Sequence, residues 1–225
     1  ANVACGFHAG DAMIMDQTVR WAKERGIGIG AHPGLPDLMG FGRRVIQMEP
    51  DELEKHMIYQ IGALQAIAVA ADYKVTHVSF HAAMGNMVTA DGAIADLMAR
   101  AIKRVDANLI VYSMPDTEVE RAAKAVGLRT HTLFLADRAY DEHGQLVSRK
   151  KPNSVITSAD AVAARVRQFM DDRSVTSIEG KRLKVRASGI LVHSDTPGSV
   201  ELIRRVRHEV EAGGATVCAA VDMLA

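Results

Sequence analysis

Short apolar runs alternate with amphipathic segments along the chain. The apolar runs predict six strands, at 2–6, 27–31, 75–80, 108–112, 130–135 and 188–192. The segments between them predict helices at 11–25, 50–71, 90–104, 115–126, 158–172 and 197–213. Strands that alternate with helices in this way indicate βα units around a parallel sheet.

Capping and turn residues define several of these boundaries. Asp11 is expected to cap the helix at 11–25, which ends just before Gly26. Pro50 suits the first turn of the longest helix, and Thr196 with Pro197 predicts the cap and first residue of the helix at 197–213. Alternating Val, Ile and Leu residues predict a hairpin inserted at 173–187.

Four apolar runs stop at a histidine that small or acidic residues follow, namely His8, His32, His81 and His193. In parallel α/β barrels the chemistry lies at the C-terminal ends of the strands. We therefore expect the four side chains to converge on one pocket, although a single histidine in such a place is more often structural.

Acidic, amide and basic side chains accompany these histidines. His8 with Asp11, and His193 with Asp195, each place an imidazole near a carboxylate, which could share a proton or a ligand or could simply cap the next helix. Two long loops follow strand ends, at 33–49 and 136–157, and loops of that length are usually functional or disordered. Further candidates in or near these loops are Arg43, Arg44, Asn86, Asp137 and Arg138.

Composition narrows the class of protein. The 225 residues are 48% apolar, enough to bury one core, and predict a single domain over 1–225. Because 27 basic residues balance 27 acidic ones, neither nucleic acid nor an anionic membrane is an expected partner. No membrane-spanning stretch or signal peptide is found, and the two cysteines suggest neither a disulfide framework nor a metal knuckle, so a cytoplasmic protein is expected. Cys5, inside an apolar run, is expected to be buried and inert.

Common catalytic and nucleotide motifs are missing from the sequence. It contains no G-x-x-x-x-G-K-[ST] phosphate loop, and Gly26, Gly28 and Gly30 do not complete G-x-G-x-x-G. It also contains neither a G-x-S-x-G elbow nor H-E-x-x-H. The expected chemistry therefore depends on histidines and carboxylates.

Five segments together resemble the LamB/YcsF family, which includes the A subunit of 5-oxoprolinase. They are 1–11, 30–44, 60–64, 136–140 and 193–197, the last reading His193-Ser194-Asp195-Thr196-Pro197. The resemblance covers essentially the whole chain. It implies a distorted seven-stranded β/α barrel of the glycoside hydrolase/deacetylase type, and a part in ATP-dependent opening of 5-oxoproline to glutamate with partner subunits B and C.

Amide opening implies roles for the candidate residues. A five-membered lactam is a resonance-stabilised amide, so its cleavage needs carbonyl activation, plausibly by phosphorylation, together with an acid and a base. In this interpretation His8 or His193 is the general base, Asp11 or Asp195 orients it, and His81 or Asn86 polarises the carbonyl. His32, Arg43, Arg44, Asp137 and Arg138 are the expected substrate-binding residues. ATP, with Mg²⁺, is the expected cofactor, completed by the partner subunits, and no bound metal is predicted in this chain.

The chain departs from the family pattern at three places. Members typically begin with a strand resembling Asp-Leu-Asn-Cys-Asp-Leu-Gly-Glu, so the first barrel strand is expected to be missing here. Where relatives read Lys-Pro-His-Gly-Ala-Leu-Tyr-Asn, this chain reads Ser79-Phe80-His81-Ala82-Ala83-Met84-Gly85-Asn86. Leu133 stands where relatives have a Glu, so a Lys and a Glu are interpreted as a charge pair removed together.

Two alternatives stay open at this level. One is a metal-dependent deacetylase, with zinc bound by His8, Asp11 and a third ligand. The other is a catalytically silent binding subunit. The sequence also leaves self-association open.

Overall fold

The computed structural model describes residues 1–224. They form two compact units, one made of Ala1–His131 with the segment from Ala219, the other of Thr132–Cys218. We call them unit 1 and unit 2 and describe each by itself. The single domain over 1–225 stays a prediction.

Unit 1 contains four parallel neighbouring strands, in the order β1 (Asn2–Ala4), β2 (Ile29–His32), β3 (Val75–Ser79) and β4 (Ile110–Ser113). Their register places Ala4 beside His32, at the C-terminal ends of β1 and β2. Residues that follow these strands therefore leave the sheet at the same edge, as the sequence pattern predicts.

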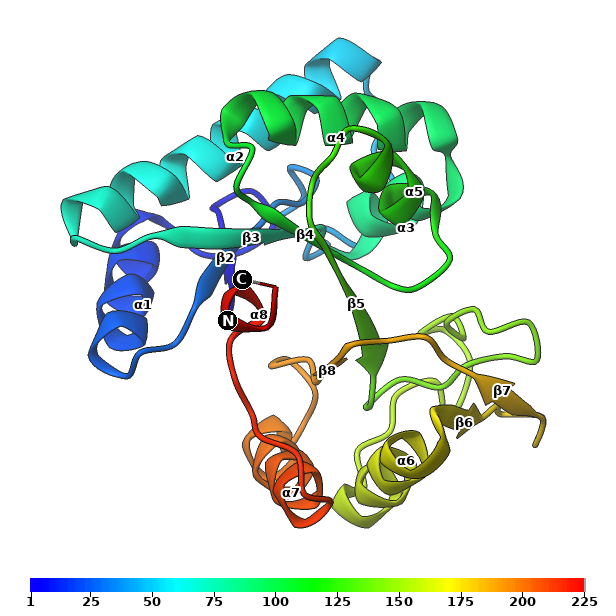
Figure 1. Cartoon of the computed structure of the whole chain (residues 1–225). Coiled ribbons are helices and arrows are strands. Elements are labelled where there is room, and N and C mark those ends of the chain that lie inside the picture. The colour runs from blue at the N-terminus through cyan, green and yellow to red at the C-terminus, as the bar shows by residue number, and fades with distance from the viewer. Residues whose placement is uncertain (225) are drawn as a thin grey trace. The chain divides into compact units, whose positions relative to one another are not determined.

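The helices of unit 1 pack against these strands and against one another (Figure 1). Figure 1 shows α2 and α4 side by side, with α5 next to α4. The bounds are α1 (Ala12–Glu24), α2 (Pro50–Ala70), α3 (Ala82–Ala90), α4 (Gly92–Val105), α5 (Glu118–Ala125) and α8 (Ala220–Met223).

The two faces of this sheet differ in polarity. Val3, Ala31 and Val78 belong to the apolar core that α2 helps to form. The alternate positions are polar: His77 Nε2 donates a hydrogen bond to Asn2 Oδ1 at 3.0 Å. A Cβ atom at Gly30 would lie 2.1 Å from the His77 ring, so only glycine fits beside it.

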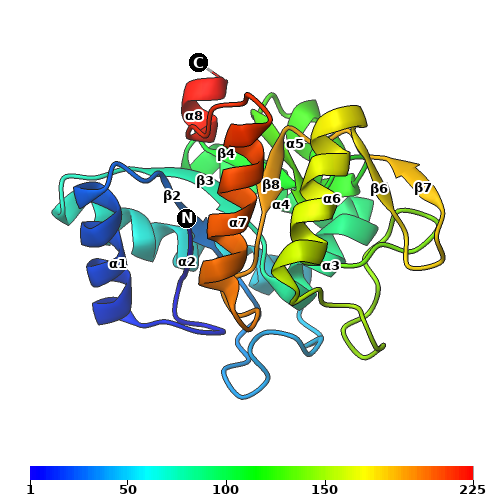
Figure 2. The same cartoon turned by 90° about the horizontal axis from the view of Figure 1, so that it is seen from below.

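Unit 2 is built around a parallel pair of strands. Strand β5 (Thr130–Leu135) begins at the end of unit 1 and pairs with β8 (Gly189–Leu191), Leu133 opposite Gly189. Figure 2 shows α6 (Ala159–Asp172) beside α7 (Ser199–Ala212). Strands β6 (Ser174–Thr176) and β7 (Arg182–Lys184) form an antiparallel hairpin. The core of this unit includes Phe134 and Phe169, whose rings stack 4.9 Å apart.

Most of the elements expected from the sequence are present. All six expected strands, the six expected helices and the hairpin form, and Asp11 caps α1 by accepting a hydrogen bond from Ile14 N at 2.8 Å. Helices α3 and α8 were not expected. The α/β class with parallel strands is confirmed, whereas the seven-stranded barrel and its missing first strand stay predictions. No helix within residues 1–224 is long and apolar enough to cross a membrane.

One expected boundary is wrong. Helix α7 begins at Ser199 with Gly198 as its N-cap, so Thr196 and Pro197 lie before it. The Thr196 hydroxyl donates to Asp137 instead of capping the helix, because a buried carboxylate is the stronger acceptor.

Candidate functional site

Three of the strand-end histidines meet in unit 1. His8 follows β1, His32 ends β2 and His81 follows β3, and the atoms with which they could bind a ligand all lie within 4.8 Å of one another. We call them the histidine cluster. The His8 and His81 rings are stacked, with centroids 3.7 Å apart, and His32 meets His81 edge to face at 4.9 Å. The convergence expected of these three side chains is present.

Backbone carbonyls orient two of the three rings. His32 Nδ1 lies 2.5 Å from Ser79 O, and His81 Nε2 lies 2.8 Å from Phe41 O. The remaining nitrogens of these rings face each other, His81 Nδ1 being 3.1 Å from His32 Nε2. Both rings are therefore fixed in direction by the chain around them.

His8 is the deeply buried member of the cluster, with 2% of its surface exposed. Its Nδ1 atom is buried and has no hydrogen-bond partner among the described residues. Burial, and to a smaller extent the charge of His81, lower the pKa of His8 to about 3. His8 is therefore a neutral imidazole near pH 7.

Glycines in the loop after β2 leave room for this ring. A Cβ atom at Gly34 would lie 2.5 Å from His8 Nδ1, and one at Gly42 would lie 2.8 Å from His8 Cβ. The buried Gln60 of α2 holds Gly34 from both sides: it accepts from Gly34 N and donates to Gly34 O, each at 2.9 Å. Helix α2 thus positions the loop against the histidine cluster.

Arg43 and Arg44 have different places in the same loop. Arg44 donates to the buried Asp37 from its backbone and its guanidinium, which lowers the pKa of Asp37 to about 2. Arg44 is therefore engaged in folding the loop, not in holding a substrate. Arg43 is exposed, with its guanidinium over the Phe41 ring at 5.1 Å. Since that ring meets the His81 ring, Arg43 is the better candidate for a carboxylate or phosphate.

Asp11 and Asn86 do not belong to the histidine cluster. The Asp11 carboxylate caps α1, as its helix-capping interpretation predicts, and it is not among the side chains grouped as possible metal ligands. Asn86 is exposed on α3. The sequence expectation that Asp11 orients His8 is corrected accordingly.

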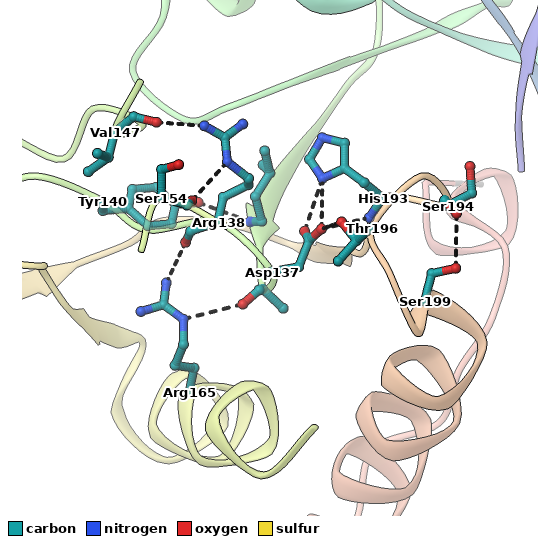
Figure 3. Close-up of polar contacts among 12 residues, drawn as sticks. Asp137, Arg138, Tyr140, Val147, Ser154, Arg165, His193, Ser194, Thr196 and Ser199 are labelled. Atoms are coloured by element: carbon teal, nitrogen blue, oxygen red, sulfur yellow. Dashed lines mark hydrogen bonds and ion pairs between the residues drawn. The ribbon is translucent and has the colours of Figure 1, made fainter. Parts of the chain in front are cut away.

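A second constellation lies in unit 2, at the C-terminal ends of β5 and β8 (Figure 3). The His193 Nδ1 atom lies 3.0 and 3.1 Å from the two carboxylate oxygens of Asp137. Thr196 Oγ1 donates to Asp137 Oδ2 at 2.6 Å, and His193 N donates to the same oxygen at 3.3 Å. A carboxylate on Nδ1 leaves Nε2 of the neutral ring as the basic atom, which is the arrangement of a general base.

This contact corrects two expectations about acids. The carboxylate that orients His193 is Asp137, whereas Asp195 is exposed. Asp137 itself is fully buried and occupied by His193 and Thr196, so it does not reach a substrate directly. Burial alone would raise the pKa of Asp137, but the hydrogen bonds and charge of His193, with Thr196, lower it.

Arg138 was expected to bind substrate and is built into the loop instead. Its guanidinium donates to Val147 O at 2.7 Å and to Ser154 O at 3.2 Å (Figure 3). Arg165 of α6 donates to Arg138 O and Ala136 O, which fixes the turn that carries Asp137. These two arginines therefore position the loop.

The comparisons with known proteins cover the same length of chain. The family model described as LamB/YcsF matches residues 1–225. The chain belongs to the LamB/YcsF family. Within it, the first of the numbered 5-oxoprolinase A subunits of Bradyrhizobium diazoefficiens is 66% identical over 100% of this chain and 88% of its own length. The 5-oxoprolinase A subunit of Pectobacterium atrosepticum is 55% identical, over 100% of this chain and 88% of its own length.

A solved structure of similar sequence supports the arrangement of elements. The lactam utilization protein from Thermus thermophilus matches with a TM-score of 0.90 at 37% identity, over 97% of this chain and 87% of that one. This chain is thus similar to its relatives in sequence and in fold.

Several residues of both constellations were not found from the sequence. Gln60, Asp37 and Thr196 act through backbone atoms or through a partner 59 positions away in the chain, as Thr196 does with Asp137. Such pairs leave no periodic signal. His193 lies in unit 2, and its convergence with the histidine cluster stays a prediction. Cys5 is 2% exposed and burial raises its pKa to about 11, in agreement with an inert thiol.

Proposed function

We propose that this chain is the A component of an ATP-dependent 5-oxoprolinase that opens the lactam of 5-oxoproline to glutamate. The observation that carries the proposal is the 66% identity, over the whole chain, to a relative named as a 5-oxoprolinase A subunit. The similarity of fold to a lactam utilization protein supports the same substrate class.

The contact between His193 and Asp137 supplies the acid and base that such a reaction needs. Water must lose a proton as it attacks the lactam carbonyl, and the ring nitrogen must gain one as it leaves. His193 Nε2 can accept the first proton and return it to nitrogen, while Asp137 holds the ring and stabilises its cationic form. The Thr196 hydrogen bond keeps the Asp137 carboxylate on the loop that carries His193.

The histidine cluster and Arg43 provide polar groups suited to the other end of a small acid. Arg43 is an exposed guanidinium beside Phe41, and a guanidinium matches a carboxylate or a phosphate. A phosphate loop is missing from the sequence. The proposal therefore assigns part of the ATP and Mg²⁺ site to partner subunits B and C.

The test is an ATP-dependent 5-oxoproline assay on the chain reconstituted with its B and C partners. Glutamate formation is measured with wild type, with Asp137→Asn and with His193→Gln. The exposed Asp171 of α6 offers a matched control, Asp171→Asn. The proposal expects glutamate only when ATP and the partners are present, a loss of turnover in the first two variants, and full turnover in the control.

Two outcomes would contradict the proposal in different ways. Turnover unchanged by Asp137→Asn and His193→Gln, with each variant folded, would remove the acid and base role of this pair. No turnover by wild type, with an intact complex on size exclusion, would favour the silent binding subunit instead.

A further inference from the structure

The facing nitrogens of His32 and His81 pose an electrostatic problem. A backbone carbonyl only accepts hydrogen bonds, so His32 Nδ1 beside Ser79 O and His81 Nε2 beside Phe41 O must each carry a proton. In the neutral rings the other two nitrogens then carry lone pairs. These are His32 Nε2 and His81 Nδ1, which lie 3.1 Å apart. Two lone pairs at that distance repel unless a positive charge lies between them.

Either a proton or a metal ion could supply that charge. A proton would make one ring cationic and would satisfy only these two nitrogens. The third member of the cluster distinguishes the two cases, because His8 Nδ1 is buried without any hydrogen-bond partner among the described residues. A buried polar atom of this kind requires an explanation, and a shared proton between His32 and His81 does not provide one.

The geometry suits a transition metal. Imidazole nitrogens bind zinc at about 2.0–2.1 Å, which places two of them about 3.3 Å apart on a tetrahedral ion. The observed 3.1 Å between His32 Nε2 and His81 Nδ1 is close to that separation. All three rings offer a nitrogen within 4.8 Å of the others. Small shifts of the side chains would bring them onto one ion.

The surroundings of the rings resemble those of metal-binding histidines. Such residues almost always donate their second ring nitrogen to a carbonyl or carboxylate, which fixes the tautomer. Ser79 O and Phe41 O act in this way on His32 and His81. At the same time Gly34 and Gly42 leave space beside His8 that any larger residue would fill. Burial also keeps His8 neutral, as a metal ligand must be.

We propose that His8, His32 and His81 together bind one divalent transition-metal ion, with zinc favoured by three nitrogen donors. Oxygen-seeking Mg²⁺ and Ca²⁺ do not match this set. Three protein ligands leave a further coordination position for a small ligand, as in catalytic zinc sites. Asp11 takes no part, in contrast to the ligand set considered from the sequence. The inference stands on this geometry and does not rest on the proposed function.

The test measures metal binding by the whole chain without reference to lactam turnover. Tag-free protein is stripped with a chelator and titrated with Zn²⁺, and the bound metal is measured by mass spectrometry. Substitution with Co²⁺ reports the ligand field by its visible absorption. The variants are His8→Ala and His32→Ala, and the matched control is His143→Ala, an exposed histidine on the loop of unit 2. Circular dichroism checks that each variant folds.

We expect about one equivalent of metal in wild type and in His143→Ala. In His8→Ala and His32→Ala the dissociation constant should rise by at least about 10²-fold, and the cobalt absorption should be lost. If a variant fails to fold, the wild-type cobalt spectrum still decides, since nitrogen ligation at a four-coordinate site gives intense visible bands. No zinc bound by wild type at micromolar concentration would overturn the proposal and leave a proton shared by His32 and His81. Unchanged binding in folded variants would equally overturn it.

Discussion

His193 Nδ1 lies 3.0 Å from a carboxylate oxygen of Asp137, although the two residues are 56 positions apart in the chain. Asp137 is fully buried, while the His193 side chain is 28% exposed. The buried acid thus holds the ring from behind and leaves its Nε2 edge toward solvent. This one contact turns an ordinary strand-end histidine into a candidate general base.

Removing the charge of Asp137 should disable that base. Asp137→Asn keeps the shape of the side chain but can present an amide N–H to His193 Nδ1, which favours the wrong tautomer. We expect kcat of the reconstituted complex to fall by about 10²- to 10⁴-fold. Steady-state glutamate formation measures it. Asp195→Asn should leave kcat within about twofold, and an equal loss in both variants would contradict the assignment of Asp137.

The same pair should make stability depend on acid pH. The folded-state pKa of Asp137 lies below its unfolded value of about 3.9, so its contribution is complete above that value. That contribution is lost as pH falls through the lower folded pKa. Urea unfolding of wild type and Asp137→Asn from pH 7 to pH 3 measures it by circular dichroism. The difference between the two free energies of unfolding should be constant above about pH 5 and should shrink below about pH 4. A difference that grows on acidification would contradict this sign.

Gln60 should be worth more to stability than its position on a helix suggests. Gln60→Leu would leave both Gly34 N and Gly34 O without their partner in a buried place. We expect the free energy of unfolding to fall by about 2–4 kcal/mol, measured by urea denaturation. Gln17→Leu, on the exposed side of α1, is the matched control and should change it by less than about 0.5 kcal/mol. Equal effects in the two variants would show that the Gly34 contacts are unimportant.

A methyl group at Gly34 should disturb the histidine cluster. The new Cβ atom of Gly34→Ala would lie 2.5 Å from His8 Nδ1, so the buried ring must move. We expect a loss of about 1–3 kcal/mol in the free energy of unfolding. Gly62→Ala in α2 has open space around its Cβ atom and should be neutral or stabilising by up to about 1 kcal/mol. Unfolding in urea compares the two, and an unaffected Gly34→Ala would mean that the ring has room to shift.

The sequence alone established the order of the elements, because hydrophobic periodicity is a local property. It also placed His8, His32, His81 and His193 at strand ends, and the similarity of five motifs pointed to the LamB/YcsF family. Helix α3 was not expected, because its Ala-Ala-Met-Gly-Asn start has neither a capping side chain nor a polar stripe. Local pattern was wrong at Thr196, where a tertiary acceptor replaced a helix cap.

What the sequence determined, then, was which side chains reach the ends of the strands. Only the tertiary structure decided which of them meet. The acid beside His193 is Asp137 and not the neighbouring Asp195, because adjacent parallel strands bring distant residues closer than a turn brings near ones. The tautomers of His32 and His81 likewise depend on carbonyls of Ser79 and Phe41, and backbone atoms are the same in every sequence. Their direction is fixed only when the chain is folded.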